Sequence, residues 1–532
     1  MHRHGNFSLT CAILLITYFS LPSSATTATH SNVTELILAI GGERTEGYDP
    51  TLGWGRYGSP LFQSTLLKRD AKLNIIGDLA FNWELSEDKK VWKISLRKDV
   101  HFSDKTPLTA EDVVYTFNTA AKSGGKVDLT LLDRAEVVDT HTVRFYLKKP
   151  QVTFIQRMIT LGIVPKHLHG PDYGRKPIGS GPFTLVQWNE GQQMVVAANP
   201  LYYGNKPAFD KITFLFVNED TAFAAAKAGK IHMAAVPQTF AVQKIDGMHL
   251  HAVPSVDNRG IMFPALPKQD KKSDEGYPIG NDVTADKAIR RAINYAIDRK
   301  ALVAGILENY GSPAYGVVDG LPWDQKSGHI TDNDLKKAQK ILQDAGWRDT
   351  DQDGVVEKDG LKAEFTLVYP ANDSIRQALA LASADMAAQV GIRIEILGKS
   401  WDDIPQYKHS NAILFGWGSH DPTEMYNLYY SKKAGQEYFN CGYYANKTVD
   451  NHLDAAMTAS TFEDSLPHWQ AAQWDGETGF MPPGDAAWAW LVNLTHTYFV
   501  NDCLNIGDSQ MEPHGHGWPI TANIETWKWG CP

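Results

Sequence analysis

The chain has 532 residues, of which 43% are hydrophobic and 21% are charged, an ordinary globular composition with room for two or three folded lobes. Its 61 acidic residues outnumber its 51 basic residues and give a formal charge of -10. This charge argues against non-specific nucleic-acid binding, which requires a basic surface.

The N-terminus has the layout of a secretory signal peptide. A short basic stretch with Arg3 precedes an apolar run from Leu9 to Leu21, and the small residues Ser23-Ser24-Ala25 follow. The run is shorter than the ~20 residues that span a membrane. We expect residues 1–25 to be cleaved after Ala25, which would place a soluble mature protein in the periplasm.

Downstream, strand patterns alternate with helix patterns. Residues 91–102, 142–150 and 211–217 show the alternation or the β-branched and aromatic enrichment of strands. Apolar residues at helical spacing appear in four segments: 109–125, 284–307, 331–347 and 373–392. A strand pattern at 392–397 follows the last of them. The first of these helices opens with the capping pair Thr109 and Asp112. The alternation predicts an α/β fold.

Two segments are predicted to cross between lobes, one at 253–266 and the other after 481–500. We expect lobe I, enlarged by a subdomain, to comprise residues 30–258 and 491–532, and lobe II to comprise residues 259–490. Two such crossings form a hinge, and the cleft between the lobes is the expected ligand site.

Three cysteines remain beyond the signal peptide, namely Cys441, Cys503 and Cys531. In an exported protein two of them are expected to form a disulfide. Their spacing does not fix the pair. We favour Cys503–Cys531, because this bond would tie down the C-terminal tail.

Several blocks of the chain resemble one protein family. They are "WELSEDKKVWKISLRKDVHFSDKTPLTAEDVVYTFN" (83–118), residues 178–217, "IRRAINYAIDRKALV" (289–303) and "LKKAQKILQDAGW" (335–347). These blocks are similar to the bacterial extracellular solute-binding proteins of dipeptide, oligopeptide and nickel ABC importers. "PHGHGW" (513–518) resembles a branch linked to nickel or metallophore uptake.

The resemblance implies two α/β lobes joined by a hinge, the first lobe enlarged, that close over a ligand. It implies a monomeric carrier without intrinsic cofactor, which delivers its solute to an inner-membrane ABC permease. An enzyme is not expected, because the chain has neither a GxSxG nor an HExxH motif.

Four residues are predicted to line the cleft by their match to family segments. Asp421, in "GWGSHDPTEMY", stands where peptide binders pair an aspartate with the peptide ammonium, although it could also cap a helix. Trp417 offers an apolar wall or a cation–π face. Trp54 and Tyr57 belong to a loop similar to the first cleft loop of the family. Core packing is the alternative for all three aromatic residues.

A basic residue is expected to bind a ligand carboxylate. The nickel-binding branch has an arginine in the segment that matches 158–167, and this chain has none there. Arg259, beside the predicted hinge, could replace it as a bidentate carboxylate clamp. The alternative is a salt bridge between the lobes.

Three histidines are candidate metal ligands. His514 and His516 are two residues apart and would face the same side of an extended segment, where both imidazoles could meet one Ni²⁺, Cu²⁺ or Zn²⁺. The alternative is a hydrogen-bonded loop that locks the tail. His420 is a weaker candidate, because the branch's histidine follows the Asp-Pro pair, where this chain has Thr423.

The leading hypothesis is therefore a receptor for nickel held by a small chelator such as histidine. The alternative is a receptor for short peptides, with Asp421 binding the ammonium and Arg259 the carboxylate.

Overall fold

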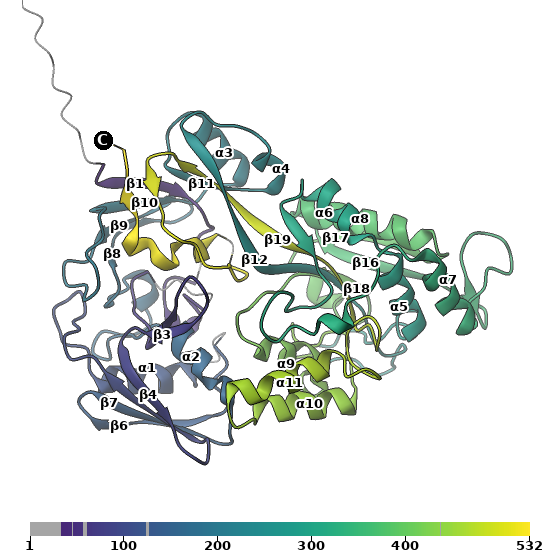
Figure 1. Cartoon of the computed structure of the whole chain (residues 1–532), viewed down its shortest axis with the longest axis horizontal. Helices are drawn as coiled ribbons and strands as arrows, with labels where there is room; N and C mark the ends of the chain where they lie inside the picture. Colours follow the sequence, from purple (N-terminus) through teal and green to yellow (C-terminus); the bar gives the residue numbers. More distant parts are fainter. Residues whose placement is uncertain are drawn as a thin grey trace, which may run out of the picture.

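The computed structural model describes residues 33–44, 46–56, 61–123, 127–436, 438–515 and 517–531. The predicted signal peptide, Tyr57 and His516 lie outside these residues. The fold is mixed α/β, with two lobes side by side and a sheet that continues from one into the other (Figure 1).

The main sheet has ten strands along one path, and an eleventh, β13, pairs with β19. Its parallel pairs are β1 with β10 and β11, and β16 with β17 and β18; the other pairs are antiparallel. The strands in sheet order are β17 (Arg393–Lys399), β16 (Glu364–Pro370), β18 (Ala412–Phe415), β12 (Met248–Met262), β19 (Trp488–Asn501), β11 (Met233–Val236), β1 (Glu35–Ala39), β10 (Lys211–Leu215), β9 (Gln193–Ala198) and β8 (Phe183–Asn189), with β13 (Gly311–Pro313) beside β19.

The long strands β12 and β19 connect the lobes. They pair from Met248 opposite Asn501 to Met262 opposite Trp488, and their register breaks between Pro254 and Asn258. The predicted crossing at 253–266 overlaps β12, and the predicted return near residue 490 falls on β19, whereas the crossing sought after 481–500 would lie at the end of β19 (Figure 1). The residue boundaries assigned to the lobes, and movement about a hinge, remain predictions.

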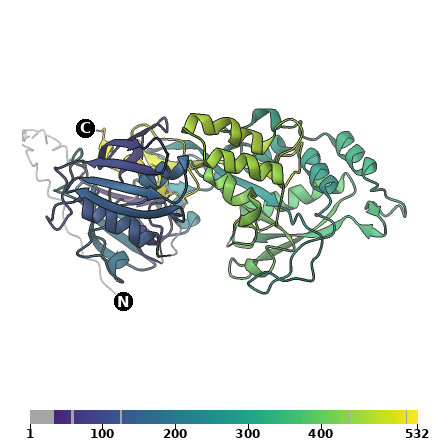
Figure 2. The ribbon, with the colours of Figure 1, turned by 90° about the horizontal axis from the view of Figure 1, so that it is seen from below.

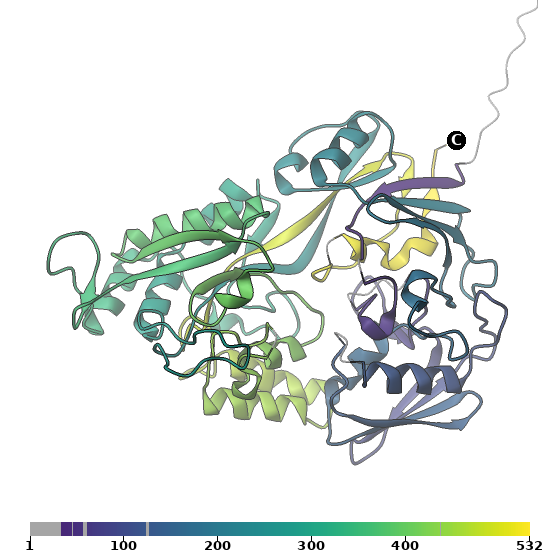
Figure 3. The same ribbon diagram turned by 180° about the vertical axis from the view of Figure 1, so that it is seen from behind.

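A four-stranded antiparallel sheet enlarges lobe I, and it lies below the main sheet in Figure 3. Its order is β4 (Ala80–Leu85), β5 (Val91–Leu96), β7 (Thr142–Leu147) and β6 (Leu132–Asp139). Helix α1 (Ala110–Ala120) packs on it, and Phe117 and Phe145 meet with ring centroids 4.4 Å apart. The predicted cap is confirmed, because Thr109 and Asp112 form a capping box.

In lobe II the sheet packs against α5 (Lys287–Ala296), α6 (Arg299–Ile306) and α8 (Ser374–Ala388), which share one apolar core. The single helix predicted at 284–307 is wrong. Ile297 is extended, with ψ 133°, and Asp298 caps the second helix by accepting from the backbone of Ala301. Tertiary packing thus interrupts a continuous apolar pattern.

The remaining helices cover the edges of both lobes, and Figure 2 shows the helical layer of lobe II from below. In lobe II they are α7 (Leu335–Asp344), α9 (Thr423–Tyr429), α10 (Lys447–Met457) and α11 (Phe462–Gln473). In lobe I they are α2 (Ile155–Thr160), α3 (Glu219–Lys227) and α4 (Gln238–Ala241). Three two-stranded sheets lie outside the larger sheets: the hairpins of β2 (Leu67–Arg69) with β3 (Ile75–Gly77) and of β14 (Glu357–Lys358) with β15 (Leu361–Lys362), and the pair of β20 (Leu504–Asn505) with the more distant β21 (Lys528–Trp529). None of the helices in the described ranges combines the length and apolar character of a membrane span.

The C-terminal tail returns to lobe I and is fixed there. The favoured disulfide is confirmed, since Cys503 and Cys531 are bonded with Cα atoms 4.9 Å apart, and Cys441 is a buried free thiol. Gly517 has φ +85°, and a Cβ there would lie 1.5 Å from the carbonyl oxygen of Ile40. Only glycine fits this close approach of the tail to β1.

Candidate functional site

Residues 416–421, between β18 and α9, form the lobe II segment that meets lobe I. The backbone amide of His514 donates to the carbonyl of Gly418 (2.8 Å), and Arg69 donates to the carbonyl of His420 (3.1 Å). The segment is shaped by Glu424, whose buried carboxyl accepts from the amides of Gly418 (3.1 Å) and Ser419 (3.2 Å). These contacts place His420 and Asp421 at the boundary between the lobes.

A cavity of about 110 Å³ lies at this boundary. Lobe I, the C-terminal tail and the 416–421 segment all contribute to its wall. The lining residues that carry charge or an imidazole are Arg56, Lys68, Arg69, Asp78, His420, Asp421 and Glu525. Because both lobes line it, this cavity is the candidate ligand site.

Asp421 is already occupied by partners from the protein. One carboxylate oxygen accepts from the backbone of Thr423 (2.9 Å), as the helix-cap alternative predicts. The other forms an ion pair with Arg157 of α2, and both side chains are mostly buried. Burial alone would lower the pKa of Arg157, but the charge of Asp421 raises it above its ordinary value. This ion pair joins the two lobes at one residue of the cavity wall, Asp421.

Arg157 was missed by the sequence analysis. It lies one residue before the segment 158–167, in which an arginine was sought. The only local signal is a basic residue within the apolar stretch "TFIQRMI".

His420 has no ion-pair partner among the described residues. In this it differs from His496 and His514, which lie outside the cavity wall and ion-pair with Asp257. Its Nε2 atom is buried and has no hydrogen-bond partner in the part of the chain that the structure describes. Burial first, and the positive charge of Arg69 second, lower its pKa to about 3. The imidazole is therefore neutral at physiological pH, and His420 belongs to the cavity wall, but its Nε2 atom is buried and has no described partner.

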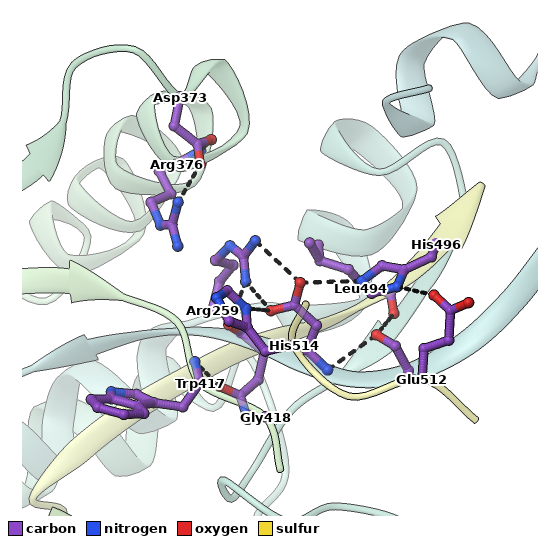
Figure 4. Close-up of polar contacts among 12 residues, drawn as sticks. Arg259, Asp373, Arg376, Trp417, Gly418, Leu494, His496, Glu512 and His514 are labelled. Atoms are coloured by element: carbon purple, nitrogen blue, oxygen red, sulfur yellow. Dashed lines mark hydrogen bonds and ion pairs between the residues drawn. The ribbon is translucent and has the colours of Figure 1, made fainter. Parts of the chain in front are cut away.

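Arg259 and His514 belong instead to a buried network at the β12–β19 crossing (Figure 4), which we call the crossing network: Asp257, Arg259, His496, Glu512 and His514. Asp257 ion-pairs with Arg259 and accepts from His514 Nδ1 (2.7 Å) and His496 Nε2 (3.2 Å). His496 Nδ1 lies 2.5 Å from Glu512.

The charges of the crossing network stabilise one another. Burial opposes protonation of His496, but its contacts with Asp257 and Glu512 outweigh burial and raise its pKa to about 9. Burial would raise the pKa of Asp257, yet Arg259 and His514 hold it well below its ordinary value. The contacts of His514 are those of a loop that locks the tail, and Arg259 forms a salt bridge, although with a neighbour on its own strand β12 and not across the lobes as the alternative expected. Ligand contact by either residue stays a prediction.

Arg376 is a second guanidinium beside Arg259, and the sequence analysis missed it too. It forms an ion pair with Asp373, its Nε has no hydrogen-bond partner among the described residues, and it points toward Arg259 and His514 (Figure 4). Burial first, and the charge of Arg259 second, lower its pKa to about 10. A cation in the first turn of α8 opposes the helix dipole, which is a sequence signal that could have identified it.

The predicted aromatic contacts are placed as follows. Trp417 is half-buried, points away from the crossing network, and packs against Phe439 at 5.8 Å (Figure 4). Trp54 is buried between Tyr48 and Trp518, with centroids 4.8 and 5.4 Å away, and neither tryptophan lines the cavity. Tyr57 and His516 lie outside the described residues.

Comparison with known proteins agrees with this architecture. Residues 74–438 match the family model "Bacterial extracellular solute-binding proteins, family 5 Middle". Protein XP55 of Streptomyces lividans is 33% identical over 87% of this chain and 84% of its own length. The oligopeptide-binding protein AppA of Bacillus subtilis is 26% identical over 75% of this chain and 76% of its own.

Among solved structures, NikZ of Campylobacter jejuni in complex with Ni(L-His) is similar with a TM-score of 0.80. It is 24% identical, and the match covers 93% of this chain and 99% of NikZ. This likeness supports the periplasmic binding protein fold. With the family model covering most of the chain and a relative above 30% identity, the chain belongs to the family 5 bacterial extracellular solute-binding proteins, non-enzymatic proteins that bind the substrate of an ABC importer.

Proposed function

We propose that this protein captures nickel as a small chelate, such as nickel-histidine, in the periplasm and delivers it to an inner-membrane ABC permease. The observation that carries the proposal is His420. Its imidazole is neutral, belongs to the cavity wall and has a buried nitrogen, Nε2, without a described partner. Once the lobes part and expose this atom, it can complete the coordination of an incoming metal chelate.

In this proposal the ligand's carboxylates bind a pair of arginines, Arg376 and Arg259, that are buried and do not belong to the cavity wall. Arg376 and Arg259 come together at Gly416, where an added Cβ would lie 3.0 Å from Nη2 of Arg376 and 2.6 Å from Nη1 of Arg259. Two guanidinium groups side by side favour an anionic group between them, because it relieves their repulsion. His514, His516, Trp417, Trp54 and Tyr57 remain further candidate contacts in this proposal.

The similarity to NikZ supports the same reading, because that protein was solved with Ni(L-His). The export signal expected at residues 1–25 supports a periplasmic location. We propose a monomer without intrinsic cofactor.

A short-peptide receptor is the second candidate, and Asp421 is the observation that favours it. Its carboxylate lines the cavity, and a peptide ammonium could displace Arg157 from it. The similarity to the oligopeptide-binding AppA points the same way.

Calorimetric titration with Ni²⁺ in excess L-histidine, and separately with a dipeptide, tests the two candidates. We expect His420→Ala to weaken capture of the nickel complex ~10-fold or more. His452→Ala, which removes a histidine on α10 that is absent from the cavity wall, is the matched control and should have no effect. Equal affinity of wild type and His420→Ala for nickel-histidine would refute the assignment. Dipeptide binding that Asp421→Asn abolishes would establish the second candidate instead.

A further inference from the structure

A second group of metal-ligating side chains lies in lobe II, in the connection between β13 and α7. Asp319, Asp324 and His329 are brought together there, and none of them lines the ligand cavity. From His329 Nε2, the distance is 3.2 Å to Asp324 Oδ1 and 3.8 Å to Asp319 Oδ1. One donor atom from each of the three residues lies within 4.8 Å of the others.

These distances fit the first coordination shell of a transition metal. Zinc lies roughly 2.0–2.2 Å from imidazole nitrogen and carboxylate oxygen, so donors at tetrahedral angles are about 3.4 Å apart. The two distances measured from His329 bracket this value. One imidazole and two carboxylates are also a donor set that suits Zn²⁺ or Ni²⁺.

The donors are held in position by the surrounding backbone and ring. Asp319 accepts from the amides of Tyr315 (2.6 Å) and Gly316 (2.8 Å), and Asp324 accepts from the amide of Gly320 (3.3 Å). The ring of His329 stacks on Tyr315, with centroids 4.7 Å apart and planes 23° apart. Such supporting contacts orient metal ligands before the metal arrives.

The group already attracts a proton, which a bound metal would replace. Burial would lower the pKa of His329, but its hydrogen bond with Asp324 and the charges of both aspartates raise it above its ordinary value. The side chains of Asp319 and Asp324 are only 9% and 3% exposed, and among the described residues His329 is their only ion-pair partner. Burial first, and the charge of Asp324 second, raise the pKa of Asp319 to about 7. Two buried carboxylates side by side are costly unless something neutralises them.

A surface hollow reaches Asp324, the one member of the group that lines it. It is lined by Gly320, Leu321, Pro322, Asp324, Gln325, Lys326 and Gln470. The contrasting cluster is Asp349, Asp351 and Asp353, which is exposed and contacts Lys362 through two of its carboxylates. In that cluster the ammonium group of Lys362 already neutralises two carboxylates, and no histidine is present.

The geometry points to a binding site for a divalent transition metal, Zn²⁺ or Ni²⁺, at Asp319, Asp324 and His329. Its ligand is the bare cation, in contrast to the chelate proposed for the cavity. A bound metal would crosslink an irregular connection of lobe II and stabilise it.

The test is titration of the full mature chain with Zn²⁺, and separately Ni²⁺, without histidine or peptide, in competition with a chromophoric chelator. We expect one bound metal in the wild type and a rise in melting temperature. Asp324→Asn and His329→Gln should each weaken binding ~10-fold or more and remove that rise. Asp351→Asn and His420→Ala are the matched controls and should bind like the wild type.

A wild type that binds no bare metal would overturn the inference, as would undiminished binding by both variants. If the variants misfold by circular dichroism, X-ray absorption of the metal-loaded wild type decides. One imidazole nitrogen and two carboxylate oxygens support the site, whereas a sulfur ligand or a shell with several imidazoles contradicts it. His420→Ala separates this result from the proposed function, because it disables only the cavity.

Discussion

Two regions at the boundary between the lobes both contain histidine and arginine, but they differ in how their charges are satisfied. In the crossing network, His496 and His514 both contact Asp257, and Arg259 ion-pairs with it. In the cavity, His420 lies beside Arg69 and has an unpartnered nitrogen among the described residues. The same residue types therefore take different roles according to the charged groups around them. The crossing network stabilises the fold, and the cavity is suited to bind a ligand.

The two regions also respond to pH with opposite signs. The folded-state pKa of His496 is about 9, above its ordinary value of 6.5, so its contribution to stability is lost as pH rises. The folded-state pKa of His420 is about 3, so folding disfavours its protonation and stability falls as pH drops below about 6.5.

The largest expected effect is on the crossing network. Asp257→Ala leaves Arg259 and His496 buried without their shared carboxylate, and we expect a loss of ~3–5 kcal/mol in the free energy of unfolding. Urea denaturation measures it. Asp99→Ala, which breaks an exposed pair with Arg97, is the control and should cost ~1 kcal/mol or less. Equal losses in the two variants would abolish the distinction between the regions.

We expect His496 to cause the decrease in the free energy of unfolding at alkaline pH. Its contribution is fully present below about pH 6.5 and declines as pH rises through about 9, by at most ~3 kcal/mol. Denaturation curves from pH 6.5 to 10 test this, with His496→Gln as the variant that should lose the slope. A slope that survives in His496→Gln would assign it to another group.

Substitutions of Arg376 and Arg259 should differ in their effects on ligand affinity and on the stability of the fold. Arg376→Ala should weaken a carboxylate-bearing ligand by ~1.5–3 kcal/mol, about 10- to 150-fold, with little change in stability. Arg259→Ala also removes the partner of Asp257, so it should destabilise the fold. Calorimetry and melting curves on both variants, with Arg376→Lys as a charge-preserving control, measure the two effects. A large stability loss in Arg376→Ala alone would reverse the assignment.

The smallest expected effect concerns the pH dependence of capture. With a pKa of about 3, His420 stays neutral down to about pH 4. Affinity for nickel-histidine should therefore stay within about twofold between pH 7 and 5.5, once protonation of the free chelator is subtracted. Calorimetry across this range provides the measurement. A steeper loss would move the metal contact to another histidine, for which His516 is the candidate.

Local sequence patterns were sufficient for much of the fold. The capping pair Thr109 and Asp112 fixed the start of α1, and alternation located β5, β7 and β10. The predicted crossing at 253–266 overlaps β12, the predicted return near residue 490 falls on β19, and the favoured disulfide is present. Each of these features depends on neighbouring residues or on a short list of possible pairs. The break between α5 and α6 was not predictable, because the apolar pattern continues through it.

The sequence by itself determined the α/β class, the family and the residue types at the boundary between the lobes. Only the tertiary structure decided their partners. Asp421 meets Arg157, 264 residues away, and His514 meets Asp257, 257 residues away. His496 had no local signal at all. Burial and long-range pairing set whether a charge is satisfied, and neither is encoded in the few residues on each side of a histidine or an arginine.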